Sequence, residues 1–159
     1  MAGSGAFLSD RRYGFAADRP AVWAAIGSVG RYREWWPWLR QFDADALVAG
    51  AVWECQIQPP VPYLLRFTVT LDRVEAPRLV VATVGGDVRG TARLELEDAR
   101  PDDGPDGARC QVRLRSTLVP ANRTLRVVAR MARPVAQFGH RWVLDTGAQQ
   151  FGDRALDPG

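Results

Sequence analysis

The sequence predicts an α+β fold in which an antiparallel sheet of seven strands wraps around one long C-terminal helix. Two hydrophobic periods carry this prediction. Apolar residues alternate at every second position through residues 41–119, and they recur at steps of three and four residues from about 122 to 151. A third observation is an N-terminal strand pattern followed by two short segments with helix signals.

The chain has the length and composition of one globular domain. Its 159 residues are 47% hydrophobic and 25% charged. We expect residues 6–151 to form this domain, with flexible segments at 1–5 and 152–159. The chain has no apolar run of the roughly 20 residues that span a membrane, and its N-terminus does not have the pattern of a secretory signal. A cytoplasmic location is therefore expected, and the lysine-free, Ala/Gly/Arg-rich usage hints at a bacterial, high-GC genome.

Charge and metal-ligand content exclude several function classes. All 21 basic residues are arginines, so lysine-based covalent catalysis is excluded. The net charge of +3 is too small to indicate a nucleic-acid partner. Cys55, Cys110 and His140 are fewer than the four ligands of a usual structural zinc site. No metal and no cofactor are expected. The cysteines are interpreted as small buried hydrophobes, with a disulfide or a reactive thiol as alternatives.

The first strand and the first short helix are predicted from parity and capping. The strand covers residues 6–17, and its aromatic face consists of Phe7, Tyr13 and Phe15. Asp18 can cap a helix, and Pro20 suits the first helical turn. A short helix therefore follows through residues 21–26 and ends at residues 27–30.

A second short helix carries a tryptophan cluster that consists of Trp35, Trp36 and Trp38. Each aromatic side chain buries on the order of 150–250 Å², so the cluster must cover a large apolar surface. Two interpretations stay open: the tryptophans line the mouth of a cavity, or they pin the two short helices to the sheet. Pro37 is expected either early in this helix or at a kink in it.

Six further strands are predicted between residues 41 and 119, because apolar and polar residues alternate along the segments of this range. Breaks with turn residues fall at 49–50, 58–62, 76–77, 85–87 and 101–107, and the last is the best candidate for a mobile loop. The inward positions are Trp53, Cys55, Ile57, Tyr63, Leu65, Phe67, Val69, Leu71, Gly90, Ala92, Leu94, Leu96, Ala108, Cys110, Val112 and Leu114. Arg66 and Arg113 fall on the opposite, solvated face.

The C-terminal helix is predicted from Asn122, a possible N-cap, to about Phe151, and Pro134 should bend or split it. Its apolar stripe consists of Val128, Met131, Val135, Phe138, Trp142 and Thr146. The opposite face is rich in arginine. This face is either solvated or makes transient contact with an anionic membrane through Arg123, Arg126, Arg130 and Arg133.

Two segments resemble a known superfamily. The stretch RPAVWAAI from Arg19 leads into RYREWWPWL from Arg31, and a terminal helix follows the strands. In this order they resemble the START/SRPBCC superfamily, nearest its bacterial polyketide cyclase/dehydrase and lipid-transport branch, over about residues 6–151. The resemblance implies the helix-grip fold, in which the sheet and the C-terminal helix enclose a pocket for lipids, polyketides or other apolar molecules.

The resemblance also implies where a ligand should be bound, namely on the inward strand positions and the inner face of the last helix. The expected ligand-binding residues are Trp35, Trp36, Trp38, Trp53, Tyr63, Leu65, Phe67, Val112, Leu114, Met131, Val135, Phe138 and Trp142. The alternative is that these residues only fill a core.

No catalytic residue is expected. Cyclisation of a polyketide needs an acid or base inside the pocket, and His140 lies at the edge of the apolar stripe. Tyr63, Ser116 and Glu34 could supply polar contacts, and Arg141 and Asp145 are spaced for a surface ion pair. We therefore predict binding of a small hydrophobic or aromatic ligand without turnover. The alternatives are a polyketide cyclase or aromatase, and a partner-binding regulator of the START type. The sequence leaves the oligomeric state open.

Overall fold

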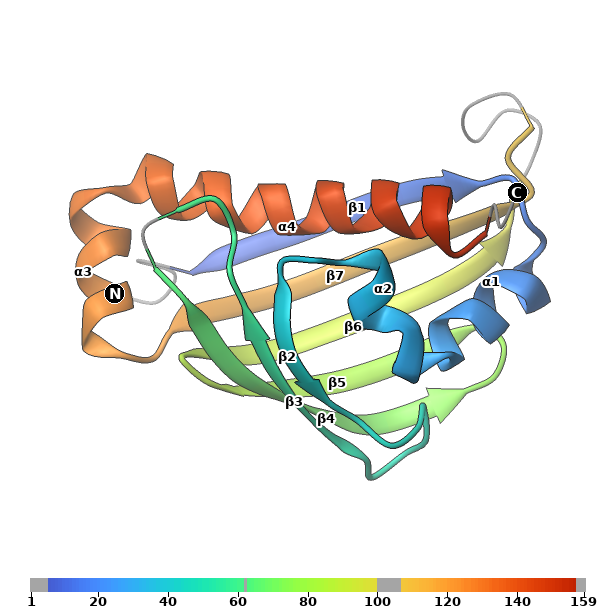
Figure 1. Cartoon of the computed structure of the whole chain (residues 1–159), viewed down its shortest axis with the longest axis horizontal. Helices are drawn as coiled ribbons and strands as arrows, with labels where there is room; N and C mark the ends of the chain where they lie inside the picture. The colour runs from blue at the N-terminus through green and yellow to red at the C-terminus, as the bar shows by residue number, and fades with distance from the viewer. Residues whose placement is uncertain (1–5, 62, 100–106, 157–159) are drawn as a thin grey trace.

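The computed structural model describes residues 6–61, 63–99 and 107–156, in which seven antiparallel strands form one curled sheet beneath a long helix (Figure 1). This confirms the predicted α+β architecture. The strands are β1 (Phe7–Phe15), β2 (Leu39–Asp43), β3 (Val52–Ile57), β4 (Leu65–Glu75), β5 (Leu79–Gly86), β6 (Val88–Asp98) and β7 (Cys110–Pro120). The helices are α1 (Arg19–Gly27), the 3-10 turn η1 (Val29–Arg31), α2 (Tyr32–Trp35), α3 (Arg123–Met131) and α4 (Arg133–Arg154).

The sheet has the order β1-β7-β6-β5-β4-β3-β2. Successive strands from β2 to β7 are neighbours, and β1 joins the far edge by pairing with β7, from Phe7 opposite Leu118 to Phe15 opposite Cys110. The register shifts once between β2 and β3 and once between β4 and β5. Such irregularities bend a strand and increase its twist. They accompany the curl that leaves the inner face concave toward α4.

The two short helices lie between β1 and β2. The Asp18 carboxylate accepts a hydrogen bond from the Ala21 N–H at 2.9 Å, and a proline lies in the first turn of α1, which confirms the predicted cap. Helix α2 ends at Trp35, and Trp36 has extended backbone angles. A residue before proline is biased away from the helical region. The prediction that Pro37 lies within or kinks this helix is therefore wrong, because the helix ends before it.

The C-terminal helix is split at Ala132, as the position of Pro134 predicted. Helix α3 crosses one end of the molecule, and α4 begins at Arg133 with Pro134 in its first turn (Figure 1). Helix α4 continues through Arg154, and Leu156 packs against the core, so ordered structure extends into the segment 152–159, for which a flexible tail was predicted. The segments 1–5 and 157–159 and most of the predicted mobile loop lie outside the described residues. Within the described ranges, no helix is long and apolar enough to cross a membrane.

Candidate ligand-binding site

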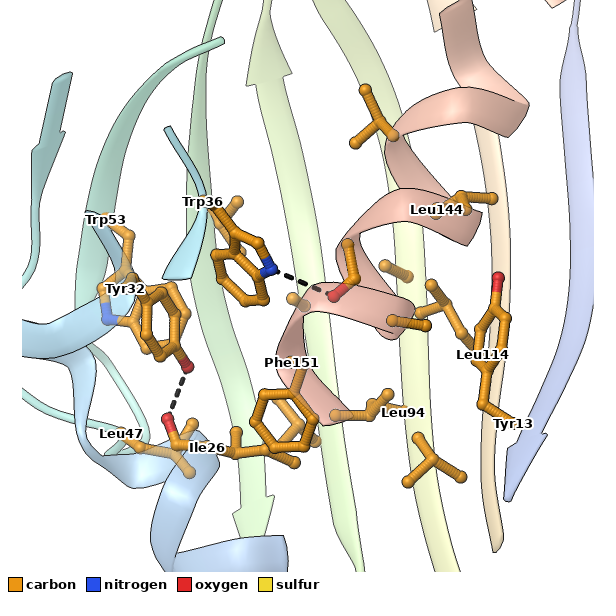
Figure 2. A pocket seen from close by; sticks show the side chains of 18 of the residues that line it. Tyr13, Ile26, Tyr32, Trp36, Leu47, Trp53, Leu94, Leu114, Leu144 and Phe151 are labelled. Carbon is orange, nitrogen blue, oxygen red and sulfur yellow. Dashed lines mark hydrogen bonds between the residues drawn. The ribbon is translucent and has the colours of Figure 1, made fainter. Parts of the chain in front are cut away.

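An apolar cavity of about 350 Å³ lies between the inner face of the sheet, α4 and the segment that carries Trp36 and Trp38 (Figure 2). The strands contribute Tyr13, Phe15, Trp53, Val69, Leu71, Val80, Ala82, Ala92, Leu94, Val112 and Leu114. The helices and connections contribute Ile26, Tyr32, Trp36, Trp38, Leu47, Val143, Leu144, Gly147, Ala148 and Phe151. The volume falls within the roughly 300–1,000 Å³ of small-molecule sites.

Trp36 and Trp38 belong to the cavity wall, and their indole groups attach to α4 and not to the sheet. The Trp36 indole N–H donates to the Gly147 carbonyl at 2.9 Å (Figure 2), and the Trp38 indole N–H donates to Gln150 Oε1 at 2.9 Å. The two rings thus form one wall of the cavity and fasten the α2–β2 segment to α4.

Trp35 lies behind this wall, in the core. It is 2% exposed, and its ring packs edge-on against Phe151 at 5.6 Å between centroids. It does not reach the cavity lining. Trp35, for which ligand binding was predicted, thus lies outside the cavity, because α2 directs this side chain into the core, whereas the extended residue Trp36 faces α4.

Trp53, Val112 and Leu114 line the cavity as expected, but the expected group of Tyr63, Leu65 and Phe67 does not. All three pack against a small cluster of Val84, Val88 and Leu125, and Leu65 and Phe67 also pack against the main core. At this end of the sheet α4 lies too close to leave space, because a Cβ on Gly139 would be 2.8 Å from the Tyr63 hydroxyl. The cavity instead uses the next inward residues of β4, Val69 and Leu71.

The predicted inner face of the last helix is also wrong. Met131 is 84% exposed and Phe138 is 50% exposed. Val135 and Trp142 are half-buried outside the lining, although Trp142 packs against Trp38. The inward residues lie one position later along the chain, a rotation of about 100°. They are Ala136, Gly139, Val143, Gly147 and Phe151.

Small residues occupy the inner face of α4 because the helix approaches its neighbours closely. A Cβ on Gly147 would lie 3.4 Å from the Trp38 ring. The helical periodicity was assigned from large apolar side chains, some of which are exposed, and the inner face was therefore predicted at the wrong positions. Tyr13 and Phe15 were also missed as site residues, although their shared parity on β1 was readable from the sequence.

The polar groups of the lining already have partners in the protein. The Tyr13 hydroxyl donates to Asp145 at 3.0 Å, the Tyr32 hydroxyl donates to the Ile26 carbonyl, and the Trp53 indole N–H donates to the Ala46 carbonyl at 3.0 Å. Burial, together with Asp145, raises the pKa of Tyr13 to about 12, and burial raises the pKa of Tyr32 further. Both phenols therefore stay neutral near pH 7. Among the described residues, no carboxylate, imidazole or thiol lines this cavity.

The cysteines are free thiols, with Cys110 buried and Cys55 half-buried. Burial raises the pKa of Cys55 to about 12 and is the main cause that raises the pKa of Cys110 to about 11, so neither is an activated thiolate. The part of the chain that the structure describes contains no group of three or more His, Cys, Asp or Glu side chains suited to a metal ion.

The other polar candidates lie away from the cavity. Glu34 pairs with Arg31 at 3.7 Å on the surface, and Ser116 Oγ lies 2.5 Å from Ser9 Oγ on the neighbouring strand. Arg66 is exposed, as predicted, and donates to Gln56. The predicted ion pair of Arg141 with Asp145 is not formed, because Asp145 accepts the Tyr13 hydroxyl instead.

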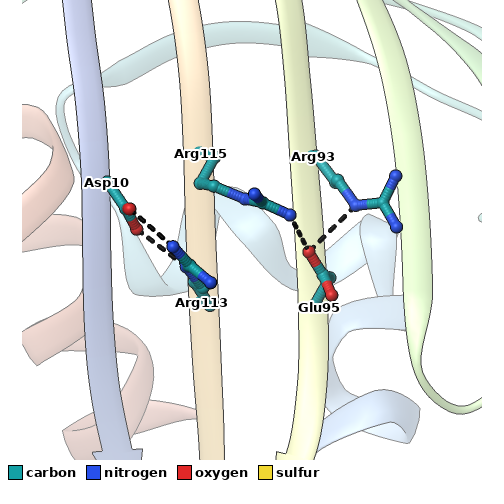
Figure 3. Close-up of polar contacts among 5 residues, drawn as sticks. All are labelled: Asp10, Arg93, Glu95, Arg113 and Arg115. Carbon is teal, nitrogen blue, oxygen red and sulfur yellow. Dashed lines mark hydrogen bonds and ion pairs between the residues drawn. The ribbon is translucent and has the colours of Figure 1, made fainter.

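The outer face of the same strands is polar and carries a network of ion pairs (Figure 3). Arg113 binds both carboxylate oxygens of Asp10, at 2.9 and 2.7 Å, and Glu95 bridges Arg93 and Arg115, at 2.9 and 2.5 Å. These hydrogen bonds hold the pKa of Asp10 and of Glu95 below their ordinary values. Arg113 thus faces solvent, as the strand alternation predicted, and the cavity lies on the opposite face of β1, β6 and β7.

Comparison with known proteins places the fold. No protein-family model and no curated protein matches the sequence. Solved structures do match: the ZhuI aromatase/cyclase from Streptomyces sp. R1128 superposes with a TM-score of 0.67 at 15% identity, over 97% of this chain and 98% of that chain. The di-domain ARO/CYC BexL from the BE-7585A biosynthetic pathway gives 0.69 at 11% identity, over 97% of this chain and 51% of that chain.

A third match is a point mutant of norcoclaurine synthase from Thalictrum flavum, solved with a transition-state analogue. Its TM-score is 0.60 at 13% identity, over 99% of both chains. The chain thus has the helix-grip fold that the resemblance implied. Identities this low show the fold alone, and one fold hosts many functions.

Proposed function

We propose that the protein binds a small hydrophobic or aromatic molecule in the cavity beneath α4, and that this cavity binds its ligand without acid–base catalysis. One observation carries the proposal: the lining is apolar and aromatic, and its few polar atoms are engaged within the protein. Transfer of apolar ligand surface from water into such a cavity contributes roughly 25 cal/mol per Å².

Two alternatives have less support. A polyketide cyclase or aromatase is suggested by the names of ZhuI and BexL. Aldol closure, however, needs a group that gives or takes a proton, and the phenols of Tyr13 and Tyr32 are held neutral with their protons directed to Asp145 and Ile26. A regulator of the START type that binds only partner proteins would need a filled core, whereas this core contains a cavity of about 350 Å³.

Filling the cavity should abolish binding. Ala148 lies on α4 within the lining, so Ala148→Phe places a ring in the space proposed for the ligand. In a tryptophan-fluorescence titration with neutral apolar compounds, we expect saturable binding to the wild type and at least about 10-fold weaker binding to this variant. Gln149→Phe adds the same ring at the neighbouring exposed position and should bind as the wild type does. Equal affinity for all three proteins would contradict the proposed location.

We also propose transient contact with an anionic membrane. The exposed residues of α3 support this contact for a smaller set of arginines than the sequence predicted. Val127 and Met131 are exposed on α3 beside Arg126 and Arg130. Arg133 does not belong to this surface, because it lies over the Phe7 ring at 5.5 Å. Exposed apolar and basic residues on one helix favour the interface of an anionic bilayer.

Vesicle binding tests this surface. We expect the protein to co-sediment with vesicles that contain phosphatidylglycerol. The doubly substituted protein Arg126→Glu/Arg130→Glu should lose at least roughly 2 kcal/mol of this binding, since each basic residue near an anionic surface contributes about 1 kcal/mol and the new glutamates are repelled. Arg12→Glu, an exposed substitution on β1, is the control. Sedimentation that is equally strong with neutral phosphatidylcholine vesicles would refute the electrostatic contact.

A further inference from the structure

We propose that the ligand carries a carboxylate, which Arg11, His140 and Arg141 bind in a second, polar pocket between β1 and α4. This inference rests on the proposed function, because the carboxylate belongs to the molecule whose apolar part occupies the cavity. The second pocket has a volume of about 350 Å³, and its walls come from the first half of β1 and the first turns of α4. These two elements run side by side in Figure 1.

Arg11 lies on the inner side of its strand. It shares the parity of Phe7, Tyr13 and Phe15 and pairs in register with the inward residue Leu114. Its half-buried side chain lines the second pocket beneath α4 instead of the solvated face where Asp10 and Arg113 are paired. A charged group beneath a helix is costly unless a group of opposite charge compensates it. No hydrogen bond or ion pair joins Arg11 to another side chain in the described ranges.

His140 also lines the second pocket. Its Nε2 is buried and has no hydrogen-bond partner among the described residues, while its ring packs edge-on against Phe7 at 5.6 Å. Burial, followed by the positive charges of Arg11 and Arg141, lowers the pKa of His140. The imidazole is therefore neutral near pH 7 in the free protein. An anion placed between these groups would favour its protonated form, which can donate a hydrogen bond.

The pocket has positive groups and no compensating carboxylate. Its charged and titratable residues are Arg11 from β1 and Arg133, His140 and Arg141 from α4, and no Asp or Glu lines it in the described part of the chain. Arg133 already donates to the Ala6 carbonyl at 3.3 Å. The nearby acid on α4, Asp145, is hydrogen-bonded to Tyr13. Arg11 and Arg141 are thus available to bind an anionic ligand. Guanidinium groups match a carboxylate in geometry and charge.

The polar pocket adjoins the apolar cavity. Leu144 lines both, and Tyr13, the inward residue that follows Arg11 on β1, lines the cavity. Figure 2 shows Leu144 on the same side of the cavity as Tyr13 and Leu114, opposite Tyr32 and Trp53. A molecule whose apolar body lies in the cavity can therefore extend past Leu144 and place an acidic end beside Arg11. An amphipathic carboxylic acid matches both surroundings.

Calorimetric titration with decanoic acid and its methyl ester at pH 7.5 tests the inference, because the ester keeps the alkyl chain and has no negative charge on its head group. We expect the acid to bind the wild type at least about 10-fold more tightly than the ester, as charge-assisted hydrogen bonds require. Arg11→Leu and the more exposed Arg141→Leu should each reduce this difference while affinity for the ester is retained. Arg12→Leu, on the outer face of β1, should leave it unchanged.

His140 provides an independent readout, since it is the chain's one histidine. Its imidazole resonances, followed through a pH titration by NMR, should report a higher pKa with decanoic acid than with the ester. Equal affinities for acid and ester would overturn the carboxylate site and leave the cavity proposal intact. Failure of both compounds to bind would overturn the cavity proposal as well. If inorganic phosphate shifts the His140 resonances while acid and ester bind alike, the pocket takes free anions and the carboxylate inference is wrong.

Discussion

Replacement of Trp35 by alanine is expected to lower the free energy of unfolding by about 3–5 kcal/mol, the usual cost of truncating a large buried aromatic side chain. Trp35 is 2% exposed and contacts the rings of Tyr32, Trp36 and Phe151. Its removal would open a void between α2 and the end of α4. Urea denaturation followed by circular dichroism measures the loss.

Trp35→Phe and Trp36→Phe form a matched pair for this prediction. The Trp35 indole N–H is buried without a hydrogen-bond partner among the described residues, so phenylalanine removes an unsatisfied donor and should cost only about 1–2 kcal/mol. Trp36→Phe instead removes the hydrogen bond to the Gly147 carbonyl and changes the cavity wall. Ligand affinity should therefore fall for Trp36→Phe but not for Trp35→Phe. The reverse order would show that the assignment of core and wall is mistaken.

Gly90→Ala is expected to destabilise the protein by about 3–5 kcal/mol, among the largest effects of a single small substitution. Gly90 lies on β6 with φ of +153°, and a Cβ there would be 1.8 Å from the Thr117 carbonyl oxygen of β7. The Thr117 carbonyl belongs to the paired backbone of β7, so β6 and β7 would have to separate locally.

Gly85→Ala provides the control for Gly90→Ala in the same denaturation experiment. A Cβ on Gly85 meets only the Thr68 hydroxyl, at 3.5 Å, which is ordinary contact. We expect little change in its midpoint of unfolding. A similar loss of stability in both variants would mean that the close approach at Gly90 is not the cause.

The sheet was predictable because strand alternation fixes the face of each residue. Val112 and Arg113 are neighbours in sequence. As the alternation predicts, Val112 lines the cavity and Arg113 belongs to the ion pairs on the outer face. The inner face of α4 was not predictable in the same way. Helical periodicity was assigned from large apolar side chains, but close packing against Trp38 and Tyr63 selects glycine at 139 and 147. A pattern of small residues at helical spacing carried the information that was missed.

The polar pocket was also readable in part. Arg11 has the parity of the aromatic residues on its strand, which is an unusual position for a charged side chain in an amphipathic strand. What the sequence could not supply is the partner surface. His140 and Arg141 come close to Arg11 only because α4 begins anew at Arg133 and lies along β1.

The pairing of the first strand with the last has a consequence for the order of folding. Ser9 meets Ser116 across the β1–β7 pair, a separation of 107 residues, whereas β2 to β7 follow one another as sequential neighbours. Contacts this distant in sequence form slowly, because a long loop must close first. During synthesis on the ribosome, β1 emerges first, but it cannot pair until β7 has been synthesised. The groove beneath α4, including Arg11 and Tyr13, is therefore expected to be completed late in folding, after the hairpins of the central sheet.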